Sequence, residues 1–107
     1  MSKKKEIKEM ANLVGNSAAH IALLPDSEFA LKEATTYTDD AAETAAGRTW
    51  NEKDVETFKD LAAKRAASEI KARIKRYDLP KNQLDKFIAR AERYIDKFAS
   101  EQMEKES

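Results

Sequence analysis

Apolar residues recur at three- and four-residue steps along most of this chain, which is the period of an α-helix. The pattern predicts four helices, over residues 3–24, 27–46, 52–77 and 81–103, followed by a frayed tail at 104–107. No segment shows the alternation of a strand. The chain has 2 glycines and 2 prolines, whereas an all-β domain needs many more turn residues. We therefore expect an all-α fold.

The start of the predicted third helix has a specific signature. Asn51 and Asp54 have the spacing of a capping box, and Trp50 and Val55 have the spacing of a hydrophobic staple. Pro80 ends the same helix, because the residue before a proline avoids helical backbone angles. Helices joined by short connections pack as antiparallel neighbours. The sequence thus predicts a four-helix antiparallel bundle with short connections.

Length and composition limit the class of protein. At 107 residues, the chain has the size of one domain, so we expect a single helical domain over 1–107. It has no cysteine and 1 histidine, which argues against thiol chemistry, Cys-ligated metals and a Ser-His-Asp site. No apolar stretch approaches the length of a membrane-spanning helix. We expect a soluble cytoplasmic protein that uses no cofactor.

Charge is unevenly distributed although the net charge is zero. Residues 1–60 hold 8 Lys/Arg and 12 Asp/Glu, so the remainder of the chain is basic. Two rows of basic residues stand opposite the predicted core faces of the third and fourth helices: Lys64, Lys71 and Lys75, then Lys86, Arg90, Arg93 and Lys97. These rows are candidates for binding a phosphate backbone or a protein partner. Asp85, Glu92 and Asp96 run alongside, so a solvated face with salt links remains the alternative.

The aromatic residues bear on the choice between partners. Tyr77, Tyr94, Phe87 and Phe98 all fall on predicted core faces. None is then left to stack on a base. Nucleic acid would therefore be bound through backbone charge, with little sequence readout.

The first predicted helix has no charged residue between Met10 and Pro25. Such a helix either lies centrally in its own bundle or meets a partner. Gly15 predicts a kink or a close helix crossing. The candidate homodimer face comprises Leu13, Gly15, Ala19, His20 and Leu24, with His20 on a partly exposed flank.

Three functions remain open. The leading hypothesis is a small non-enzymatic interaction protein, that is, an adaptor, subunit or regulator that uses a helical face. The alternative is a nucleic-acid-associated protein that uses the basic face of the third and fourth helices. The third is a metal-dependent all-α hydrolase, which would need acidic pairs such as Glu6/Glu9 and Asp40/Glu43 to converge. The second pair lies opposite its helix's apolar face, which disfavours convergence.

Overall fold

The computed structural model describes residues 3–23 and 50–102. These residues form α1 (Lys3–Ala22), α3 (Glu52–Tyr77), a short 3-10 turn (Lys81–Gln83) and α4 (Leu84–Gln102). No strand occurs in these two ranges, so the all-α prediction is confirmed. The helix predicted at 27–46 lies outside the described residues, and the four-helix count therefore stays a prediction.

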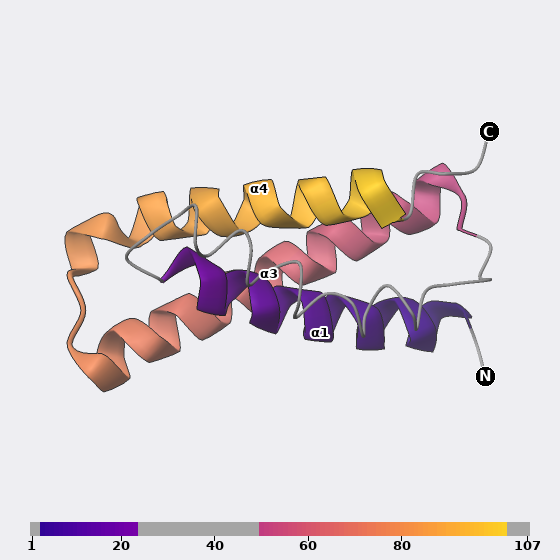
Figure 1. Ribbon diagram of the computed structural model, residues 1–107. Helices are drawn as coiled ribbons and strands as arrows, with labels where there is room; N and C mark the ends of the chain where they lie inside the picture. Colours follow the sequence, from indigo (N-terminus) through magenta and orange to yellow (C-terminus); the bar gives the residue numbers. More distant parts are fainter. Residues whose placement is uncertain (1–2, 24–49, 103–107) are drawn as a thin grey trace.

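Each of the three helices packs against the other two. As Figure 1 shows, α1 and α3 run in the same general direction and α4 runs back along both. Contacts agree with this order, since Asn16 meets Arg65 whereas His20 meets Arg73 farther along both helices. The turn at 78–83 makes α3 and α4 antiparallel, as the short connection predicts.

The predicted capping box at the start of α3 is confirmed. The Asn51 side chain accepts a hydrogen bond from the Asp54 backbone N–H at 2.8 Å, and the Asp54 carboxylate accepts one from the Asn51 N–H at 3.2 Å. Trp50 and Val55, on either side of the cap, are both buried. At the other end, Asp78 adopts a left-handed conformation and its N–H bonds to the Ile74 carbonyl, which ends the helix.

The core faces of α3 and α4 match the predicted helical phase, with one exception. Phe58, Phe87 and Phe98 are buried, and the Phe58 and Phe98 rings lie 5.8 Å apart. The remaining core residues of these two helices are Val55, Ala62, Ala66, Ile70, Ile74, Ala91, Tyr94, Ile95 and Ala99. Leu84 is partly buried and packs against this core.

Tyr77 is the exception, since it was expected on the core face and is 62% exposed. Helix α1 ends at Ala22, and its residue His20 is level with Arg73 of α3. The last turn of α3 therefore extends past α1, and the chain turns away at Asp78. A periodic pattern cannot reveal that the neighbouring helix has ended.

Gly15 marks a close crossing of α1 and α3, not a kink. A Cβ atom at Gly15 would lie 2.8 Å from the Ala62 carbonyl oxygen and 2.8 Å from Arg65 Cβ, closer than van der Waals contact allows. Gly15 and Ala19 are both buried. The expectation that Gly15 would lie on a surface open to a second copy is therefore corrected, because α3 of the same chain occupies that side.

Candidate functional site

Helix α4 carries its charges along two edges, one on each side of its buried face. We call Lys86, Arg90, Arg93 and Lys97 the basic edge, and Asp85, Glu92 and Asp96 the acidic edge. The acidic edge faces α3, since Lys59 Nζ lies 4.0 Å from the Asp96 carboxylate. The basic edge faces α1, since Arg90 Nη1 donates to the Ala22 carbonyl oxygen at 3.4 Å. Positive charge is thus gathered beside the contact between α1 and α4.

Three residues of the basic edge are exposed: Lys86, Arg93 and Lys97. Within residues 3–23 and 50–102, none of these three forms an ion pair. The row runs over twelve residues, from Lys86 to Lys97, which is eleven steps or about 16 Å at 1.5 Å per step. Arg90 is half-buried and satisfies a carbonyl at the end of α1, so it helps to hold the two helices together.

The lysines predicted on α3 do not join the basic edge. Lys64, Lys71 and Lys75 are exposed, and Lys64 pairs with Asp60 at 3.1 Å. They lie on the side of α3 opposite the core, whereas the basic edge lies on the side of α4 away from α3. The two rows therefore point to opposite sides of the bundle and do not form one continuous surface.

The candidate homodimer residues are divided by the fold. Leu13 is 41% exposed, whereas Gly15, two residues later, packs against α3. His20 is half-buried at the contact with α3. Leu24 lies outside the described residues. Among the members of this set that the structure describes, Leu13 is the exposed apolar residue.

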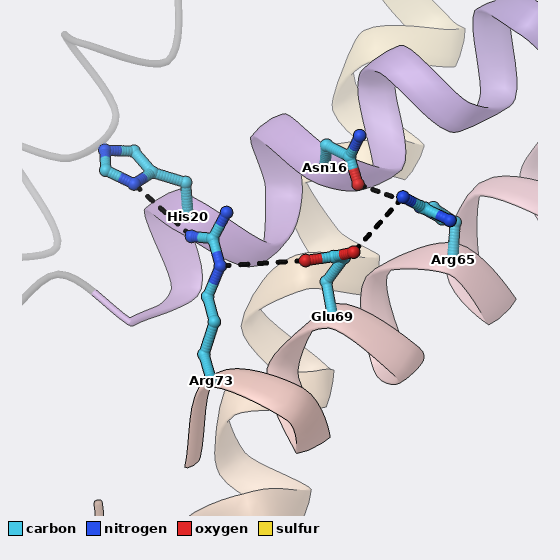
Figure 2. Close-up of polar contacts among 5 residues, drawn as sticks. All are labelled: Asn16, His20, Arg65, Glu69 and Arg73. Atoms are coloured by element: carbon cyan, nitrogen blue, oxygen red, sulfur yellow. Dashed lines mark hydrogen bonds and ion pairs between the residues drawn. The ribbon is translucent and has the colours of Figure 1, made fainter. Parts of the chain in front are cut away.

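A chain of polar contacts joins α1 to α3 (Figure 2). Arg65 Nε donates to Asn16 Oδ1 at 2.9 Å, and Arg65 also pairs with Glu69 at 3.1 Å. Arg73 Nε lies 3.8 Å from the other oxygen of Glu69, and Arg73 Nη1 lies 3.5 Å from His20 Nδ1. Two guanidinium groups therefore share one carboxylate. We call these five residues the α1–α3 polar seam.

Sequence reasoning did not identify this seam. A signal was present, because Arg65, Glu69 and Arg73 are spaced four residues apart and such neighbours meet on a helix surface. Asn16 and His20 have the same spacing on α1. Their register against α3 depends on the crossing at Gly15, which the pattern of α1 does not specify.

A hollow of about 490 Å³ adjoins the end of the polar seam. The described residues that line it are His20, Leu23, Glu69, Arg73, Arg76, Tyr77 and Leu79. The Arg76 guanidinium lies 6.0 Å from the centre of the Tyr77 ring, within the distance of a cation–π contact. The hollow thus has charged and apolar walls.

In residues 3–23 and 50–102, no group of three or more acidic or histidine side chains is placed to hold a metal ion. The pair Asp40/Glu43 lies outside these ranges. No described helix is long and apolar enough to cross a membrane.

Burial raises the pKa of the Tyr94 phenol well above its usual range, so this group stays neutral within the core.

Comparison with protein-family models, with curated proteins and with solved structures gave no match to this chain.

Proposed function

We propose that this chain is a small non-enzymatic interaction protein that binds an acidic protein partner through the basic edge of α4. The observation that carries the proposal is the separation of charge on this helix. On its acidic edge Asp96 pairs with Lys59 of α3, while Asp85 and Glu92 are exposed. Its basic edge leaves Lys86, Arg93 and Lys97 exposed and, within the described residues, without an ion pair.

Exposed basic side chains in one row suit an acidic partner for two reasons. A row of like charge attracts a complementary surface and speeds its encounter, even in a protein with no net charge. Arginine also binds carboxylates through two parallel hydrogen bonds, which fixes the register of the partner. Leu13 supplies an exposed apolar side chain on α1. Such binding should weaken with salt, because exposed charges are screened.

The alternative is a nucleic acid bound by the same edge. A row of four basic residues over about 16 Å is long enough to contact several phosphates. The lysines of α3 point to another side of the bundle, so they would not extend that contact. A single row favours a small acidic protein surface over a nucleic acid, which draws its affinity from many phosphate contacts.

Affinity capture from the native cell, with and without nuclease, tests the proposal. The variant K86E/R93E/K97E reverses three charges of the basic edge without touching Arg90, which contacts α1. The matched control K64E/K71E/K75E reverses three charges on the exposed side of α3. A protein captured by the wild type in the presence of nuclease should be lost with the first variant and retained with the control.

Two results would overturn the proposal. Capture that disappears with nuclease would favour the nucleic-acid alternative. Equal loss with both variants would mean that overall charge governs binding and that the edge of α4 has no special role. Sedimentation equilibrium of the purified chain measures self-association separately, with Leu13→Glu as the variant that should dissociate a homodimer built on α1.

A further inference from the structure

We propose that the hollow at the end of the α1–α3 polar seam binds a small phosphate monoester that carries an apolar or aromatic group. This site is separate from the basic edge of α4 and does not depend on the function proposed above. Its volume of about 490 Å³ falls within the range of small-molecule pockets. Its lining includes a cationic wall, which would contact the phosphate, and an apolar wall, which would contact the apolar or aromatic group.

The hollow and the adjoining polar seam together hold more guanidinium groups than carboxylates to pair with them. Arg65, which belongs to the seam and does not line the hollow, and Arg73 both pair with Glu69. Arg76 pairs with no carboxylate among residues 3–23 and 50–102. The C-terminal ends of α1 and α3 lie at this end of the bundle, each with about half a negative charge, and they offset part of the positive charge of the arginines.

Arg73 is held in place before any ligand arrives. Glu69 contacts its Nε from α3, and the His20 imidazole lies 3.5 Å from its Nη1 on the α1 side (Figure 2). A side chain that is already ordered loses little conformational entropy on binding. Since a guanidinium has five N–H donors, Arg73 retains donors for a ligand.

Arg73 and Arg76 are three residues apart on α3, and side chains at this spacing are neighbours on the helix surface. Two guanidinium groups can therefore contact a single anion. A phosphate monoester offers three terminal oxygens and close to two charges near neutral pH, whereas a carboxylate offers two oxygens and one charge. The arrangement therefore favours phosphate.

The apolar wall determines what the phosphate carries. Leu23, Tyr77 and Leu79 line the hollow together with the charged residues. Tyr77 is largely exposed and has Arg76 over its ring, so a ligand ring could stack beside it. Burial of such a group against leucine and tyrosine side chains adds affinity that inorganic phosphate lacks.

Isothermal titration calorimetry with three probes tests the proposal: phenyl phosphate, inorganic phosphate and benzyl alcohol. Phenyl phosphate should bind about tenfold or more tightly than inorganic phosphate, since burial of a ring contributes on that order. Benzyl alcohol, which lacks the charge, should bind more weakly than phenyl phosphate. The variant R73Q/R76Q should weaken phenyl phosphate binding by about tenfold or more, the usual size of a lost charged hydrogen bond.

The matched control is K71Q/K75Q, which removes two charges from exposed positions of the same helix and should change the affinity by less than about twofold. Because Arg73 also contributes to the polar seam, Arg76→Gln serves as a second variant. Arg76 is exposed and its loss should leave the fold intact while it weakens phenyl phosphate binding. Absence of binding by the wild type at millimolar probe, or equal weakening by K71Q/K75Q and R73Q/R76Q, would overturn the proposal.

Discussion

Gly15→Ala tests the closest contact in the fold. In an isolated helix this change is stabilising by about 1 kcal/mol, because glycine is a poor helix former. Here the added methyl group would lie 2.8 Å from the Ala62 carbonyl oxygen and 2.8 Å from Arg65 Cβ. Neither atom is the free end of a flexible side chain, so the helices themselves must move apart.

The net effect follows from two opposing terms. Overpacking of this kind costs about 1–3 kcal/mol, and the gain in helix propensity offsets about 1 kcal/mol of it. Because one of the two clashing atoms belongs to the backbone of α3, we expect a cost in the upper half of that range. The free energy of unfolding should then fall by about 1–2 kcal/mol, and the Tm by roughly 4–8 °C for each kcal/mol.

Urea denaturation followed by circular dichroism measures this difference, with Asn12→Ala as the control. Asn12 is an exposed residue of the same helix, so its replacement by alanine should be stabilising by a few tenths of a kcal/mol through propensity alone. The reasoning fails if Gly15→Ala is as stable as the wild type or more stable while Asn12→Ala behaves as expected. Such a result would mean that α1 and α3 do not cross closely at Gly15.

Three further predictions concern stability. Asn51→Ala removes the side-chain half of the capping box and should lower the free energy of unfolding by about 0.5–2 kcal/mol; an unchanged Tm would show that the cap contributes nothing. Phe58→Ala empties a fully buried position beside Phe98 and should cost about 3–5 kcal/mol in urea denaturation. Burial raises the pKa of Tyr94 in the folded state, so the neutral phenol contributes to the free energy of unfolding. This contribution is complete below about pH 10, where an unfolded tyrosine titrates. It is lost as the pH rises further. The free energy of unfolding should decline less with rising pH in Tyr94→Phe than in the wild type. An equal decline in both proteins would mean that Tyr94 is not its source.

The sequence by itself determined the local structure of the described helices. The three- and four-residue spacing of apolar residues specified which faces of α3 and α4 are buried, because a helix with one apolar side has one way to hide it from water. The start of α3 was equally predictable, since Asn51 and Asp54 satisfy each other's backbone groups within four residues. Such features depend only on neighbours along the chain.

The contacts between helices were decided by the tertiary structure. Tyr77 has the periodicity of a core residue and is nevertheless exposed, because α1 ends before the last turn of α3. In the sequence, the lysines of α3 and the basic edge of α4 both recur opposite the apolar positions of their helix. In the structure they point to different sides, because the two helices lie on different sides of the core.

The polar seam illustrates the same limit at the level of single contacts. Arg65 reaches Asn16 and Arg73 reaches His20 only because the crossing at Gly15 sets the register of α1 against α3. Each pair is separated by about fifty positions in the sequence. A pattern of hydrophobicity specifies which side of a helix is buried, whereas the register between two buried sides depends on how their particular side chains fit together.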